Sequence, residues 1–166
     1  MSVVTKLLSV AAVSAAILSA PAMAGPIIIA GTDADDHGSV SLGVNQDGWK
    51  FMQLAVERIT AAVTNTNTSF VCIGCNPGEA QTAFTSAFGL AAKPAGWTTT
   101  SLTAIADITN FFNGTGTVNV NNTGAIYMPS EQGDVGGGIT AAQQAALSGA
   151  GINTFVSNGG GLFTQV

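Results

Sequence analysis

The chain has 166 residues, of which 8% are charged, and nine acidic side chains outnumber four lysines and arginines to give a net charge of −5. Because nucleic-acid affinity comes largely from basic side chains on phosphates, this balance excludes DNA and RNA as partners. It disfavours an anionic membrane surface for the same reason. A hydrophobic content of 46% is unlike that of an intrinsically disordered chain, and neutral polar residues provide the solvation.

The first 24 residues have the three parts of an export signal. Lys6 supplies the positive start, residues 7–18 form an apolar run, and Ala22-Met23-Ala24 is a small-x-small cleavage site. The run is shorter than the roughly 20 residues that span a bilayer, although an uncleaved anchor or a buried helix is the alternative. We therefore expect a signal peptide over residues 1–24 and a secreted or periplasmic bacterial protein, with no membrane contact after cleavage. Residues 25–166 then form a single α/β domain.

The first half of this domain predicts two strands, each followed by a helix. The β-branched run at 26–31 would be apolar on both faces, which indicates a central parallel strand covered by helices. After a polar loop, Asp47 caps a predicted helix over 48–63, whose apolar residues recur at three- and four-residue steps. The second strand is predicted at 69–74, and Asn76-Pro77 begins the next helix as its cap and first turn.

The second half repeats the alternation. A short strand is predicted at 97–100, and Ser101 then caps a third helix that ends at 113–116. A fourth strand at 124–129 leads into a glycine-rich acidic loop. Thr140 and Gln143 form a capping box that opens one last helix, and a fifth strand follows it at 161–166.

Strands that alternate with helices imply right-handed crossovers and a parallel sheet. The predicted fold class is therefore α/β, a flavodoxin-like three-layer sandwich with a parallel sheet of about five strands. Ligands of such sheets bind beyond the carboxyl ends of the strands, so the loops at those ends are the candidate site.

The loop after the first strand holds three acids and the only histidine within five residues: Asp33, Asp35, Asp36 and His37. Packed carboxylates repel one another, raise one another's pKa or recruit a cation. Oxygen ligands with one imidazole suit a divalent cation such as calcium, magnesium or manganese, so these four residues are the candidate metal ligands. Acid/base catalysis by His37 is a further alternative, and a solvated loop whose aspartates cap turns is the plainest one.

Cys72 and Cys75 flank two residues at the end of the second predicted strand. In an exported chain with two cysteines, a local disulfide is the expected state. The same C-x-x-C spacing ahead of a helix is the layout of thiol oxidoreductases, so redox activity remains an alternative, as do free or metal-bound thiols.

The loop after the fourth strand contributes Ser130, Glu131 and Asp134 to the candidate ligand site. It leads into a helix N-terminus, whose backbone N–H groups can hold an anion. Its two acids argue against phosphate, and it matches neither the P-loop nor the dinucleotide fingerprint. A flexible connection is the alternative.

The order of elements, together with Phe155-Val156-Ser157-Asn158-Gly159-Gly160-Gly161-Leu162-Phe163, resembles the trehalose-utilisation-type and class I glutamine amidotransferase-like domains of exported bacterial proteins. The resemblance covers residues 26–166, and its sharp motif is the last dozen residues. It implies a nucleophilic cysteine after the triple glycine, where this chain has Thr164, Gln165 and Val166, and no histidine follows to act as base. The resemblance thus implies a C-terminally truncated copy, and it carries over no catalytic residue.

Three functions fit this sequence. The first is a non-catalytic exported domain that binds a small ligand or a surface partner through the loops at the strand ends. The second is a metal-dependent hydrolase centred on residues 33–37. The third is a thiol-disulfide protein that uses the two cysteines.

Overall fold

The computed structural model describes residues 23–165, so all but the last two residues of the predicted signal peptide lie outside the described part of the chain. Within that part, no helix is long and apolar enough to cross a membrane.

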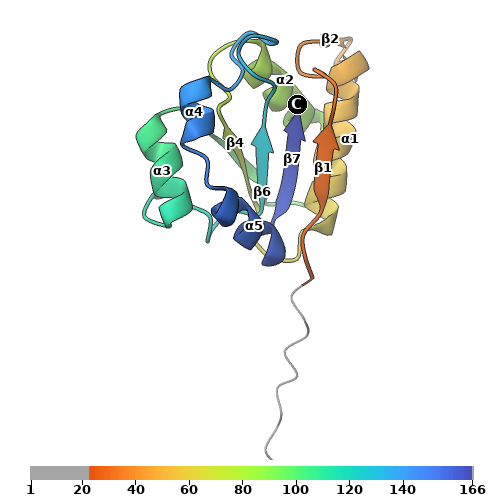
Figure 1. Cartoon of the computed structure of the whole chain (residues 1–166). Helices are drawn as coiled ribbons and strands as arrows, with labels where there is room; N and C mark the ends of the chain where they lie inside the picture. Colours follow the sequence, from red (N-terminus) through yellow and green to blue (C-terminus); the bar gives the residue numbers. More distant parts are fainter. Residues whose placement is uncertain (1–22, 166) are drawn as a thin grey trace, which may run out of the picture.

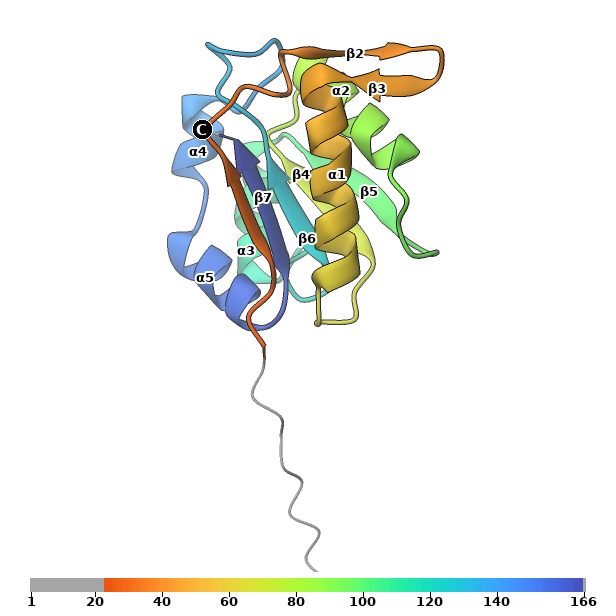
Figure 2. The same ribbon diagram turned by 90° about the vertical axis from the view of Figure 1, so that its right-hand side faces the viewer.

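A five-stranded parallel sheet in the order β1-β7-β6-β4-β5 forms the middle layer (Figure 1). Helices cover both faces of this sheet (Figures 1 and 2). The predicted flavodoxin-like three-layer α/β sandwich is therefore confirmed. Its strands are β1 (Ile27–Ala30), β4 (Ser69–Ile73), β5 (Thr98–Leu102), β6 (Ala125–Met128) and β7 (Gly161–Gln165). Its helices are α1 (Asp47–Ala62) and α2 (Glu79–Leu90) on one face, and α3 (Ile105–Asn113), α4 (Ala141–Ala145) and α5 (Gly149–Ser157) on the other.

The strand side chains alternate between two apolar layers, as the period of two in a strand requires. On the face of α1 and α2, Tyr127 stacks between Phe84 and Phe163, with ring centroids 5.1 and 4.8 Å away. On the opposite face, Ile126 and Leu162 pack with residues of α3 and α5. This alternation fixes which strand residues reach each layer.

The position predicted for the first strand is wrong, because β1 lies at the edge of the sheet next to β7. Ile28 packs against the α1 layer, whereas Ile27 and Ile29 are 53% and 65% exposed. A run of three isoleucines indicates a strand that is apolar on both faces, but it cannot show that helices cover both of them. This outer position puts the acidic loop at a corner of the molecule.

Three predicted helix starts differ from the structure. Asp47 is the first residue of α1 and has a φ of 50°, and Gln46 takes the cap position without a side-chain bond. Asn76 lies ahead of α2, whose cap is Gly78. Ser101 belongs to β5. Polar residues of these types also occur in turns and at strand ends, so residue type alone does not locate the start of a helix.

Two further features of the fold were not predicted, a β-hairpin and the division of the last helix. The loop ahead of α1 contains a hairpin of β2 (Gly38–Ser41) and β3 (Val44–Gln46). The last predicted helix is divided into α4 and α5, because Ser148 begins a new helix by accepting a bond from the Gly151 amide. The capping box at Thr140 and Gln143 is confirmed.

Candidate functional site

The loops after β1 and β6 meet above the carboxyl ends of the strands. Asp35, in the first loop, is fully buried. Its Oδ2 accepts hydrogen bonds from the Tyr127 hydroxyl at 3.0 Å and the Ser130 amide at 2.9 Å, and its Oδ1 accepts one from Ser130 Oγ at 2.8 Å. Both carboxylate oxygens are therefore held by protein donors. Asp35 and Ser130, two of the predicted ligand-binding residues, instead bind each other and tie the two loops together.

Gln165 and Tyr127 complete this buried network. Gln165 donates from Nε2 to the Tyr127 hydroxyl at 2.8 Å, and its Oε1 accepts from the Ala34 amide at 2.7 Å. Burial, followed by the nearby charge of Asp35, raises the pKa of Tyr127 well above its usual value, so the hydroxyl keeps its proton and donates it. Sequence reasoning missed both residues, although a tyrosine inside a buried strand signals a hydroxyl that needs a partner.

Asp33, Asp36 and His37 lie outside the network, on the surface. One ligand atom of each can be chosen so that all three lie within 4.8 Å of one another, and Asp35 is not part of this group. His37 Nδ1 is 3.2 Å from an Asp33 carboxylate oxygen and 3.8 Å from one of Asp36, while 69% of the His37 side chain is exposed. The predicted metal ligands are therefore divided between a surface group of three and one buried side chain.

The imidazole of His37 is biased toward its charged form. Its Nδ1 lies 3.3 Å from the Asp33 carbonyl oxygen, and this hydrogen bond, followed by the Asp33 carboxylate charge, raises the pKa of His37 above 6.5. A histidine binds a metal ion through its neutral imidazole, so cation binding at His37 competes with that proton.

β4 and β6 are neighbours in the sheet, and the helices that follow them, α2 and α4, lie on opposite faces; this is the position at which such folds bind ligands. Here the glycine-rich loop after β6 lies against the start of α2. The Asn76 amide donates to Gly137 at 2.8 Å, and the Ala80 amide in the first turn of α2 donates to Gly136 at 3.0 Å. Asn76 Nδ2 also donates to Gly138 at 2.8 Å. The glycine-rich loop is therefore held by hydrogen bonds from the residues around the start of α2. One backbone N–H group in the first turn of α2 is thereby bonded within the protein and is not free for a ligand.

The two cysteines form the expected disulfide beneath this loop. Cys72 and Cys75 are bonded, with Cα atoms 5.7 Å apart, and both residues are fully buried. Thiol exchange requires an attacking thiolate to reach a sulfur atom. Burial therefore favours a structural disulfide over a redox-active one.

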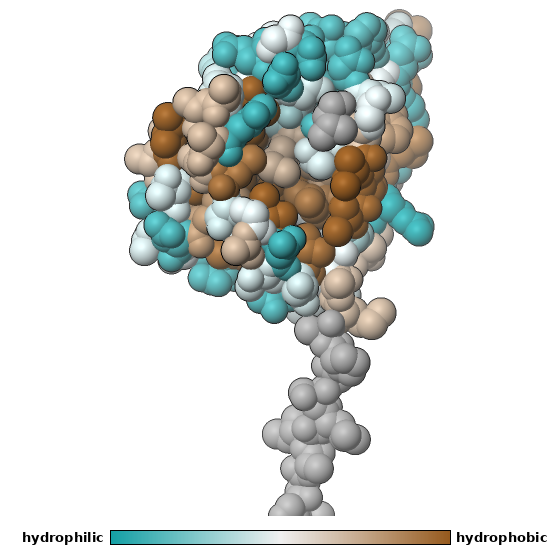
Figure 3. Space-filling view, viewed as in Figure 1, coloured by the Kyte–Doolittle hydropathy of each residue, from teal (hydrophilic) through white to brown (hydrophobic). Residues whose placement is uncertain are grey.

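Glu131 and Asp134 lie beside an open hollow of about 390 Å³. Met128, Ile139 and Leu147 give it an apolar lining, and both carboxylate residues are exposed. Neither carboxylate forms an ion pair with any residue in the described range. Hydrophilic side chains gather along the upper edge of the molecule, above the strand ends (Figure 3). The hollow thus combines apolar walls with uncompensated negative charge.

A second hollow, of about 620 Å³, lies on the other side of the Asp35 network. Asp33, His37 and Asp47 line it together with Ile29 and Phe51. The predicted site residues consequently fall into two surface groups, separated by the buried network.

No protein-family model, curated protein or solved structure matches the chain. The site must therefore be interpreted from its own chemistry.

Proposed function

We propose that this protein is a non-catalytic exported binding domain that takes a small cationic ligand with an apolar body in the hollow beside Glu131 and Asp134. The observation that carries the proposal is two carboxylates that have no ion-pair partner among residues 23–165 and lie next to an apolar lining in a concave site. Ligand sites usually combine apolar walls with a few polar groups that fix orientation. A positive group would bind the carboxylates while its hydrocarbon part contacts Met128 and Leu147.

The buried network supports binding rather than catalysis. Asp35, Tyr127 and Ser130 already bind one another, so their polar groups hold the rim in place and are not free to attack a substrate. A site held by buried hydrogen bonds needs little ordering when a ligand arrives.

The test is a titration with hexylamine, which is charged at pH 7, against hexanol, which has the same chain without charge. The NMR signals of the Leu147 methyl groups should shift at a lower concentration of hexylamine than of hexanol. The combined change Glu131→Gln and Asp134→Asn, which keeps the size of both side chains, should abolish the difference. Equal binding of the two ligands, or binding that the variant leaves unchanged, would contradict the proposal.

A divalent cation at Asp33, Asp36 and His37 is the second candidate, favoured by the closeness of their ligand atoms. A cation that binds the folded state alone raises the melting temperature. Calcium or manganese should therefore stabilise the protein, and Asp33→Asn should remove the effect. A metal-dependent hydrolase built on this cation loses Asp35 as a ligand, because its carboxylate is held inside by Tyr127 and Ser130.

A further inference from the structure

The outer edge of β1 is unpartnered. β1 pairs with β7 on one side, and no described strand pairs with it on the other. Figure 2 looks onto this side of the molecule, where β1 lies in front of β7 and beside α1. An exposed strand edge is a template for pairing with another chain.

The direction of the free backbone groups follows from the pairing with β7. Leu162 donates its amide to the Pro26 carbonyl, so Pro26, Ile28 and Ala30 turn their backbone groups toward β7. Because these directions alternate along a strand, Ile27 and Ile29 turn their N–H and C=O groups outward. The free edge therefore offers two donors and two acceptors, symmetrically placed about Ile28.

The side chains around this edge are apolar. Ile27 and Ile29 are exposed, and so are Phe51 and Leu54 on α1, at 41% and 52%. Figure 3 shows apolar side chains gathered over the right-hand part of the molecule, where β1 lies. Natural edge strands usually carry a lysine, a proline or a bulge that blocks pairing, but Ile27–Ala30 has none of these.

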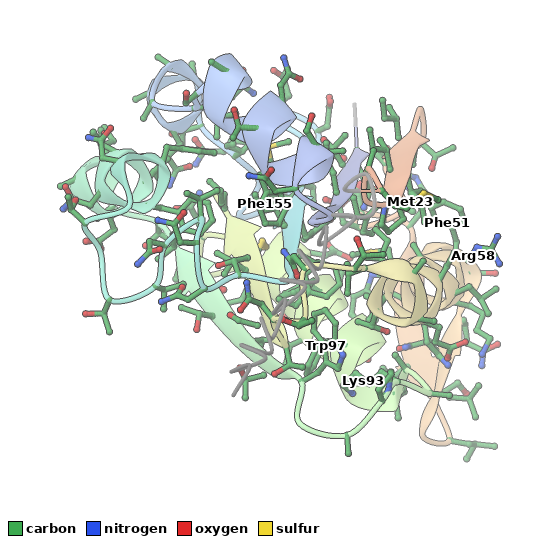
Figure 4. The ribbon with its side chains drawn as sticks, turned by 90° about the horizontal axis from the view of Figure 1, so that it is seen from below. Met23, Phe51, Arg58, Lys93, Trp97 and Phe155 are labelled. Carbon is green, nitrogen blue, oxygen red and sulfur yellow. A yellow bond between two sulfur atoms is a disulfide. The ribbon has the colours of Figure 1, made fainter. Side chains whose placement is uncertain are left out.

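The charges near this edge are self-complementary. Gly48, at the start of α1, donates to the His37 carbonyl just beyond the end of β1, whereas Ile59 lies against Gly161 at the start of β7. α1 therefore runs opposite to β1, which places Asp47 at the acidic end and Arg58 at the other. Arg58 is exposed and forms no ion pair within residues 23–165. Phe51 and Arg58 lie on the same outer side of the molecule as β1 (Figure 4).

We propose that two copies of this chain pair antiparallel through their β1 strands, about a twofold axis at Ile28. Ile27 of each copy then lies opposite Ile29 of the other, and each such pair exchanges two backbone hydrogen bonds. The result is a continuous ten-stranded sheet. A twofold interface uses the same patch on both copies, which a self-complementary edge satisfies.

This arrangement accounts for the exposed apolar and charged groups together. The four isoleucines at positions 27 and 29 form one cluster on the uncovered face of the sheet. On the other face, the two α1 helices meet antiparallel, so Phe51 and Leu54 become covered. The same axis brings Arg58 toward the acidic end of the second copy, where Asp33 and Asp47 lie. The hollow beside Glu131 has no lining residue from β1 or α1, so it stays open.

The primary test is amide hydrogen exchange of the purified chain at several concentrations. The Ile27 and Ile29 amides should become protected as concentration rises, while the Ile28 amide, bonded to β7, should be protected throughout and serves as the internal control. Sedimentation of the same sample should give twice the chain mass. A monomer at every concentration, or Ile27 and Ile29 amides whose exchange ignores concentration, would overturn the proposal.

Two variants locate the interface. Ile29→Lys places a charge in each half of the isoleucine cluster and should raise the dimer dissociation constant about 100-fold or more. Leu42→Lys, at a fully exposed hairpin position, is the matched control and should leave it unchanged. Arg58→Glu should raise it roughly 3- to 30-fold, since two exposed ion pairs are lost. A dimer that survives Ile29→Lys with its native circular dichroism would show that β1 is not the interface.

Discussion

Removal of the Tyr127 hydroxyl tests the buried network that joins Asp35, Ser130 and Gln165 above the strand ends. In Tyr127→Phe the ring keeps its stacking on Phe84 and Phe163, so the change is confined to hydrogen bonding. The variant loses the bond to the Asp35 carboxylate, and a hydrogen bond to a charged group contributes about 1.5–3 kcal/mol. It also leaves Gln165 Nε2 without its acceptor, which costs about 1 kcal/mol more. The expected loss is therefore about 2.5–4 kcal/mol of unfolding free energy.

Urea unfolding at pH 7, followed by tryptophan fluorescence, measures this loss. Thr109→Val is the matched control, because it removes a hydroxyl that bonds only its own exposed helix turn and should change stability by less than about 0.5 kcal/mol. Combination of Tyr127→Phe with Asp35→Asn should cost less than the sum of the two single changes, since both remove the same contact. A Tyr127→Phe loss no larger than that of the control, or strict additivity, would refute the assignment of Asp35 as the anchor of the rim.

Three further predictions follow from the geometry. NMR titration of His37 should give a pKa above 6.5, and Asp33→Asn should lower it only in part, because the carbonyl bond remains; a pKa at or below 6.5 would contradict this. The pKa of His37 is higher in the folded protein than in the unfolded chain, so the protonated imidazole stabilises the fold. This contribution is complete below pH 6.5 and is lost as pH rises through the pKa of the folded protein. Alanine at both cysteines should lower the unfolding free energy by about 2 kcal/mol, the amount expected for so short a loop, with native circular dichroism as the check on folding. Gly78→Ala should lower the unfolding free energy by about 2 kcal/mol or more, because alanine rarely adopts a φ of 155° and its Cβ would strike the Gly136 carbonyl. Gly89→Ala, in open space on α2, should instead raise the unfolding free energy by about 0.5–1 kcal/mol in the same urea assay.

The layered fold was predictable because its signals are local. Short β-branched runs separated by amphipathic helices leave few alternatives to a parallel sheet, and the capping box at Thr140 is encoded within four residues. The disulfide was predictable for a similar reason, since two cysteines three positions apart have few other partners.

The composition of the site was not predictable, because it depends on long-range contacts. Asp33, Asp35 and Asp36 are equivalent in the sequence, yet only Asp35 is buried, since its partners Tyr127 and Ser130 come from more than ninety residues away. The edge position of β1 has the same origin. Its hydrophobicity is local, but its neighbour in the sheet is decided by where β7 docks.

The pairing of β1 with β7 also dictates an order of folding. Ile27 lies beside Leu162, so the first strand of the sheet finds its partner only after the intervening residues 31–160 have been synthesised. Contacts of such sequence separation form slowly, because a long loop must close before they are gained. β1 must therefore stay unpaired until β7 has been made, and the bonds of Asp35 to Tyr127 and Ser130 likewise require β6 and the loop after it.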